Sequence, residues 1–238
     1  MIRVWQRWPL AQIEAVNPDQ IIVKICGLSS AETLDAALAA GADMVGFVFF
    51  DPSPRNLLPE EARALVGQVQ DRAQKVALTV DTDDAKLEAI VDALAPDILQ
   101  LHGRETPERV RQIRSRFGIP VMKAIGISSS SDLGRAEVYA AAADMLLFDA
   151  KPAPEALLPG GNGLAFDWSI LKGFAGDRPW MLSGGLDCGN VSEALTATGA
   201  RGVDVSSGVE SAPGVKDPAR IAAFVAAVHA LSPAGRSR

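Results

Sequence analysis

A cysteine stands where a short apolar run gives way to a helix-start signal, in the stretch "KICGLSS". Side-chain alternation along a strand would place Lys24 and Cys26 on one face and Val23 and Ile25 on the other. The pattern "SSAE" at 29–32 is a capping box, so a helix is expected to begin just after the thiol. A helix N-terminus and a nearby cation both lower a thiol pKa. The residues alone leave two readings open, a reactive thiol or a buried structural one.

A carboxylate ends a second apolar run, in "DMLLFDAK". Alternation groups Met145, Leu147 and Asp149, so the carboxyl would lie above apolar neighbours, and partial desolvation would raise its pKa toward neutral pH. The alternative is that Asp149 caps the following loop. If Asp149 and Cys26 face the same site, they form a base–acid pair.

Two glycine-containing stretches predict a binding site for an anion. "LSGGL" at 182–186 and "VSSGVE" at 205–210 each follow a β-rich run. Small residues let backbone N–H groups approach a phosphate, and a short helix after the second stretch would add its dipole. "GGNG" at 160–163 could close over the same group. The pattern predicts a phosphorylated small molecule as ligand.

Other polar residues carry weaker signals. Arg55, next to a proline, could bind a carboxylate in bidentate fashion or be a solvated loop arginine. His102 could line a pocket, but bonding a loop is the favoured reading, and His229 is expected to be structural. Lys24 and Asp204 are expected to form a buried ion pair, and Cys188 receives no role.

The elements that must position these residues repeat along the chain. Ala-rich helical patterns separate eight β-rich runs spaced as βα units are. This number closes a parallel sheet, so the prediction is a single-domain (β/α)8 TIM barrel; a doubly wound open sheet is the alternative. Pro/Gly-rich inserts at 50–61 and 149–163 are expected to cover the catalytic face. The strands are predicted to start near Ile21, Asp43, Lys75, Asp97, Pro120, Asp144, Pro179 and Gly202.

Composition narrows the class of protein. The chain has 238 residues, 48% of them hydrophobic, and a net charge of −6. Neither nucleic acid nor an anionic membrane is expected as partner. The terminal apolar run at 221–231 is too short to span a bilayer, and the N-terminus does not resemble a signal peptide. Two scattered cysteines suggest neither a disulfide framework nor a zinc site, so a cytoplasmic location without metal is expected.

Nine motifs occur in order: "VKICG", "DMVGFVF", "SPR", "LQLHG", "KAIGIS", "LLFDAK", "FDWSIL", "LSGGL" and "VDVSSGVE". Together they resemble the phosphoribosylanthranilate isomerase family of tryptophan biosynthesis, over roughly Ile21 to Leu231. The resemblance implies a cofactor-free Amadori rearrangement of N-(5-phosphoribosyl)anthranilate to 1-(2-carboxyphenylamino)-1-deoxyribulose 5-phosphate. It also implies a barrel at 21–231. Residues 1–20 extend beyond the usual start of the family, and the tail at 232–238 is expected to be frayed.

Site roles follow from the same resemblance. Cys26 is similar to the family's general base and Asp149 to its general acid, and Arg55 would hold the anthranilate carboxylate. The phosphate loops would include Gly184, Gly185, Ser207 and Gly208. "TVDTDD" departs from the family, which often has an asparagine there, and leaves the role of that loop open. The tryptophan-bearing extension is expected to dock on the barrel face opposite the active site.

Other functions remain as alternatives. A pentose-phosphate epimerase would need inward His and Asp metal ligands, which two scattered histidines do not supply. Indole-glycerol-phosphate synthase would need a lysine-centred acid–base set. A non-catalytic barrel that binds phosphorylated metabolites is disfavoured by Cys26 together with Asp149. The sequence does not give the oligomeric state.

Overall fold

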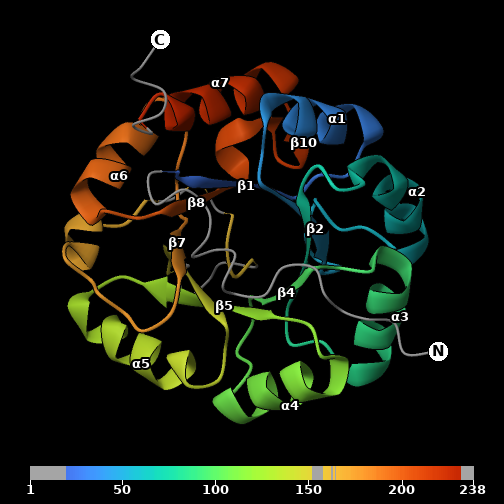
Figure 1. The fold of residues 1–238 in the computed structure, drawn as a ribbon, viewed down its shortest axis with the longest axis horizontal. Helices are drawn as coiled ribbons and strands as arrows, with labels where there is room; N and C mark the ends of the chain where they lie inside the picture. The colour runs from blue at the N-terminus through green and yellow to red at the C-terminus, as the bar shows by residue number, and fades with distance from the viewer. Residues whose placement is uncertain (1–19, 152–157, 162, 164, 232–238) are drawn as a thin grey trace.

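Eight parallel strands close into a barrel in the computed structural model, which describes residues 20–151, 158–161, 163 and 165–231 (Figure 1). Strand β1 pairs with both β2 and β8, so the sheet has no open edge and the doubly wound alternative is wrong. Every strand begins within one residue of its predicted start. The strands are β1 Ile22–Cys26, β2 Met44–Phe49, β3 Gln74–Thr79, β4 Ile98–Leu101, β5 Val121–Ile127, β6 Met145–Ala150, β7 Trp180–Leu182 and β8 Gly202–Val205.

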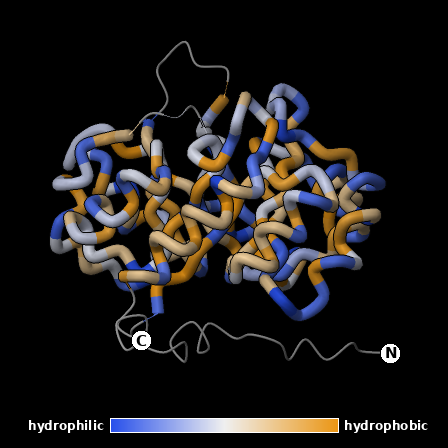
Figure 2. The backbone as a smooth tube through the Cα atoms, turned by 90° about the horizontal axis from the view of Figure 1, so that it is seen from above, coloured by the Kyte–Doolittle hydropathy of each residue, from blue (hydrophilic) through white to orange (hydrophobic). Residues whose placement is uncertain are grey.

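Helices surround the barrel, and hydrophobic segments run through the middle of the molecule (Figures 1 and 2). Outward strand residues and inward helix residues share one large apolar cluster, as burial on both faces of a parallel sheet requires. A separate, methionine-rich cluster fills the barrel interior below the site. The α-helices are α1 Ala31–Ala40, α2 Pro59–Val69, α3 Asp84–Leu94, α4 Pro107–Phe117, α5 Gly134–Ala140, α6 Val191–Thr198 and α7 Pro218–His229.

Helix α1 begins one residue later than the capping box predicted. Ser30, not its neighbour, is the N-cap, and its side chain accepts a hydrogen bond from the Thr33 amide. Gly41 ends the helix with φ of 89°, a conformation that glycine adopts without steric cost.

The segment between β6 and β7 breaks the βα rhythm. Its described residues form only a short 3-10 helix, η3 (Trp168–Leu171). The Pro/Gly-rich sequence before it disfavours a regular helix. Packing on this side of the barrel relies instead on the aromatic cluster of Phe148, Phe174 and Trp180, whose ring centroids lie 5.1–5.8 Å apart.

A small hairpin follows β8 and was not predicted. The 3-10 helix η4 (Ser207–Val209) leads into β9 (Glu210–Ala212), which pairs antiparallel with β10 (Val215–Lys216). The dipeptide Pro213-Gly214 between them is a turn signal that could have revealed the hairpin.

The expectations for the extension and for the tail fall on residues 1–19 and 232–238, outside the described residues. Among the helices of the described ranges, none has the length and apolar character needed to cross a membrane.

Candidate active site

One pocket opens at the carboxyl ends of the strands, with about 790 Å³ of empty volume including its mouth. A space of this size suits a small organic molecule. The expected inserts contribute to it, through Arg55 from the first and Gly160 and Gly161 from the second. Of the predicted site residues, the lining includes Cys26, Arg55, Asp149, Gly184, Gly185 and Ser207.

Cys26 is 3% exposed and sits at the floor of this pocket, at the end of β1. Room for it comes from Gly46 on β2, because a Cβ there would lie 3.0 Å from Cys26 Sγ. The predicted ion pair below it is confirmed: Lys24 Nζ lies 2.8 Å from Asp204 Oδ1, and both residues are buried.

The expectation of a lowered thiol pKa is wrong for this environment. Burial raises the pKa of Cys26 above the usual cysteine value, although the ammonium groups of Lys24 and Lys216 act in the opposite direction. The neighbouring cation and the helix can be recognised in the sequence, whereas the loss of hydration depends on how the folded chain buries the thiol. The thiol is therefore mostly protonated at neutral pH before a ligand binds.

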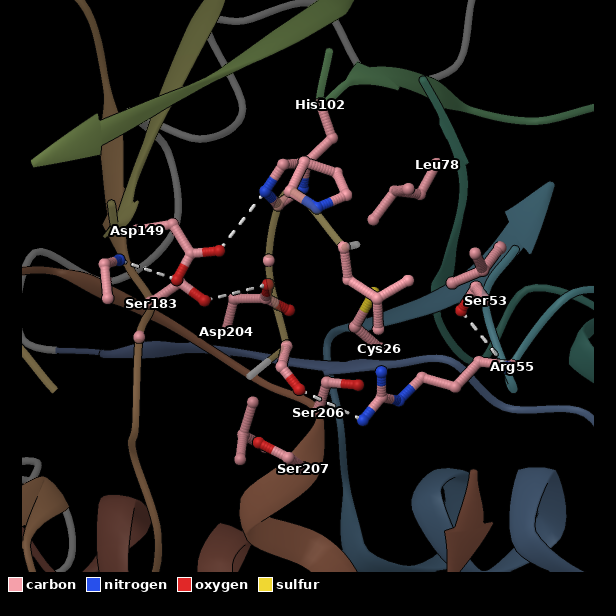
Figure 3. Close-up of a pocket in the computed structure, with 18 of the residues that line it drawn as sticks. Cys26, Ser53, Arg55, Leu78, His102, Asp149, Ser183, Asp204, Ser206 and Ser207 are labelled. Carbon is pink, nitrogen blue, oxygen red and sulfur yellow. Dashed lines mark hydrogen bonds and ion pairs between the residues drawn. The ribbon is translucent and has the colours of Figure 1, made fainter. Parts of the chain in front are cut away.

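Asp149 is 4% exposed at the end of β6. Its Oδ1 accepts a hydrogen bond of 2.8 Å from the Ala150 amide, and its Oδ2 lies 3.2 Å from His102 Nε2. His102 thus lines the pocket against the carboxylate (Figure 3), and the favoured reading of a loop-bonding histidine is wrong. Two glycines make this packing possible: a Cβ on Gly160 would lie 2.5 Å from Oδ2, and one on Gly184 would lie 3.1 Å from Oδ1.

Arg55 is buried, so the solvated alternative is wrong. Its Nε and Nη2 donate to the two carboxylate oxygens of Glu210 at 2.7 and 2.9 Å. Nη2 also lies 3.3 Å from the carbonyl oxygen of Gly161. In Figure 3 the guanidinium and Asp149 come from opposite sides, with Cys26 between them.

Glu210 and Lys216 of the hairpin were missed by sequence reasoning. Lys216 Nζ donates to Glu210 at 2.7 Å and to both oxygens of Ser206. Burial lowers the pKa of Lys216. Burial also opposes ionisation of Glu210, but Arg55 and Lys216 prevail and lower its pKa. Two buried cations against one carboxylate leave an excess positive charge, which favours an anionic ligand.

The two predicted phosphate loops lie side by side. Gly184 and Gly185 have φ of 92° and 64°, and a Cβ on Gly184 would lie 2.6 Å from the Ala150 amide nitrogen. Gly208 has a different position from the other three predicted residues, since it is absent from the pocket lining. A Cβ there would lie 1.9 Å from the Leu186 carbonyl oxygen, so Gly208 lets the loops pack together.

The loop after β3 contains the departure from the family pattern. Asp81 has φ of 47°, a conformation that Asp and Asn tolerate better than most residues. Its Oδ1 accepts from the Arg104 amide at 2.7 Å, and its own amide donates to Glu105 at 2.9 Å. Aspartate therefore ties this loop to the one after β4.

No group of three or more His, Cys, Asp or Glu side chains within the described ranges is arranged to hold a metal ion. The titratable side chains that line the pocket are Cys26, Arg55, His102, Asp149, Lys151 and Asp204. Asp204 is paired with Lys24 and Lys151 with Asp132, whereas Cys26, Asp149 and His102 are the candidates for acid–base chemistry.

Known proteins share both the sequence and the fold. Residues 23–227 match the family model described as N-(5'-phosphoribosyl)anthranilate (PRA) isomerase. A protein of that name from Azorhizobium caulinodans is 62% identical over 216 residues, covering 91% of this chain and 95% of its own. Its namesake from Rhodopseudomonas palustris is 60% identical over 210 residues, covering 88% and 96%.

Solved structures of phosphoribosyl anthranilate isomerases are similar to this chain in fold as well as in sequence. The phosphoribosyl anthranilate isomerase of Thermotoga maritima is 36% identical, with a TM-score of 0.78, covering 88% of this chain and 98% of its own. A phosphoribosyl anthranilate isomerase in complex with reduced 1-(o-carboxyphenylamino)-1-deoxyribulose 5-phosphate has a TM-score of 0.75 at 34% identity, with the same coverage. The chain, with its closed barrel and its pocket above Cys26 and Asp149, belongs to the N-(5'-phosphoribosyl)anthranilate isomerase family.

Proposed function

We propose that this protein isomerises N-(5'-phosphoribosyl)anthranilate to 1-(2-carboxyphenylamino)-1-deoxyribulose 5-phosphate, with Asp149 as general acid and Cys26 as general base. The observation that carries these assignments is the convergence of the two side chains in one pocket. Conversion of substrate by the purified protein, followed as loss of the anthranilate-type fluorescence, tests the activity itself.

The first step is opening of the sugar ring. Asp149 gives its proton to the furanose ring oxygen, the bond from this oxygen to C1 breaks, and the nitrogen lone pair forms an iminium ion. The resulting carboxylate keeps the hydrogen bond from the Ala150 amide, which stabilises its charge.

The second step is proton removal from the sugar C2. The adjacent iminium cation acidifies this C–H bond and also favours the thiolate of Cys26, which takes the proton. The enolamine then tautomerises to the ketone of the product. A pocket that shields the site from water suits both steps, since it strengthens electrostatic interactions within it.

Binding follows from the rest of the pocket. The loops at 183–186 and 206–208 would hold the phosphate through backbone N–H groups, with Gly184, Gly185, Ser207 and Gly208 as the predicted residues. Arg55, aligned by Glu210, would bind the anthranilate carboxylate. The similar phosphoribosyl anthranilate isomerase structure, which contains reduced 1-(o-carboxyphenylamino)-1-deoxyribulose 5-phosphate, supports a phosphorylated small molecule as the ligand.

The Arg55 role gives a binding prediction. Arg55→Ala should mainly raise KM, because a charge-assisted hydrogen bond contributes about 1.5–3 kcal/mol, equivalent to roughly 10- to 150-fold in affinity. Arg104→Ala is the matched control, since that arginine side chain is 97% exposed on a neighbouring loop. Steady-state kinetics of both variants check the role, and an unchanged KM in Arg55→Ala would exclude it.

The environment of Cys26 gives a pH prediction. Because burial raises its pKa, the thiolate fraction of Cys26 should be low near pH 7 and should rise only above the pH range in which an ordinary cysteine ionises. The charged groups around the thiol are Lys24, Asp204 and Lys216. Titrating the thiolate absorbance in a Cys188→Ser background gives the pKa directly. A value below that of an ordinary cysteine would contradict the prediction.

The remaining proposals concern the whole chain. Residues 21–231 would form a single catalytic domain, with residues 1–20 as an extension and 232–238 as a tail. The enzyme would act in the cytoplasm, without a cofactor and without nucleic acid or membrane as partner, which accords with its net charge of −6.

A further inference from the structure

Two polar side chains behind Asp149 have no part in the mechanism so far. Gln100, fully buried on β4, has its Nε2 3.1 Å from His102 Nδ1. The other ring nitrogen of His102, Nε2, lies 3.2 Å from Asp149 Oδ2 (Figure 3). The three residues form a chain from the barrel interior to the pocket.

The chemistry of the amide sets the protonation of the ring. An amide nitrogen only donates, so Nδ1 of His102 must accept from Gln100 and carry no proton. The neutral imidazole then has its proton on Nε2, which points at Asp149. In this arrangement His102 is an uncharged hydrogen-bond donor to the carboxylate.

The orientation of the Gln100 side-chain amide leaves one of its polar atoms without a hydrogen bond among the described residues. Its Oε1 is buried and lacks a hydrogen-bond partner within the described ranges. Rotating the amide by half a turn would put Oε1 against His102 Nδ1, and this contact would need a proton on Nδ1. The orientation of one buried amide therefore decides which nitrogen of His102 is protonated. An unpartnered buried polar atom calls for a reason of this kind.

The backbone at Gly160 covers the contact between His102 and Asp149. A Cβ on Gly160 would lie 2.5 Å from Asp149 Oδ2 and 2.7 Å from His102 Nε2, so backbone packs directly over the pair. The covering backbone keeps water away and strengthens the hydrogen bond.

Among the described residues, Asp149 forms the ion-pair contact that His102 makes. Lys123 lies on the outward face of β5, and Glu105 and Asp81 lie in the loops after β4 and β3. Hydrogen bonds join Glu105 to both of the others. The other charged or titratable residues that line the pocket are Cys26, Arg55, Lys151 and Asp204.

We propose that Gln100 holds His102 as the neutral Nε2–H tautomer, and that His102 is a positioning residue for Asp149. Its N–H orients the acid and stabilises the carboxylate left after the proton has gone to the substrate. The inference rests on the proposed role of Asp149 as general acid.

Nitrogen-15 NMR of histidine-labelled protein tests the tautomer without any need for turnover. The chain has two histidines, and a His229→Asn variant assigns the other one. We expect His102 to be neutral with its proton on Nε2 near pH 7. In Gln100→Glu, whose ionised carboxylate has nearly the same shape but only accepts, His102 should gain a proton on Nδ1. A wild-type His102 with a proton on Nδ1, alone or in the doubly protonated ring, would overturn the proposal.

Kinetics test the positioning role. His102→Ala should lower kcat by about 10- to 100-fold with little change in KM, as for other residues that orient a catalytic group. His102→Gln places an uncharged amide donor near the same point, and should recover most of this loss. Unchanged kcat in His102→Ala, or no recovery in His102→Gln, would overturn the role. If Asp149→Asn instead keeps wild-type kcat, the proposed acid fails while the tautomer result stands.

Discussion

Cys26→Ser should keep the fold and bind substrate, but lose about 10²- to 10⁴-fold in kcat, the usual contribution of a general base. A serine hydroxyl fits the space that the buried thiol occupies, but its pKa lies far above that of a thiol. It therefore cannot supply an anion to take the C2 proton. The kinetic comparison uses steady-state kcat and KM together with the melting temperature.

Cys188→Ser is the matched control, because this cysteine is exposed and lies outside the pocket lining. It should behave like the wild type in both kinetics and melting. Comparable kcat values for Cys26→Ser and the wild type would show that another group is the base.

Asp149→Asn should also lose about 10²- to 10⁴-fold in kcat, since an amide cannot give a proton to the ring oxygen. The substitution keeps the size of the side chain, which matters where Gly160 and Gly184 approach so closely. Binding of the reduced product analogue and the melting temperature should change much less than kcat. Wild-type kcat in this variant would move the acid role to another residue.

The barrel could be predicted because local patterns determine it. Apolar runs at regular spacing gave strand starts within one residue, and alternation placed Lys24 and Asp204 on facing positions of strands that become neighbours. The interval after β6 was less predictable, because Pro/Gly-rich sequence carries no period and its packing depends on Phe148, Phe174 and Trp180.

The site was predictable only in part. Residues at strand ends, such as Cys26 and Asp149, follow from alternation and topology. The environment of these residues does not follow from alternation and topology. The raised pKa of Cys26 comes from burial by distant segments, and the contacts of Arg55 with Glu210 join residues 155 positions apart. The contact of His102 with Asp149 likewise depends on how β4 and β6 converge.

In the proposed mechanism, Asp149 opens the sugar ring as general acid and Cys26 removes the C2 proton as general base. Single-turnover rates with substrate deuterated at C2 of the ribose test it most directly. In Cys26→Ser, proton removal should be the slow step, so deuterium should slow the reaction clearly. In Asp149→Asn, ring opening should be slow and deuterium should have little effect. An isotope effect in Asp149→Asn but not in Cys26→Ser would contradict the account.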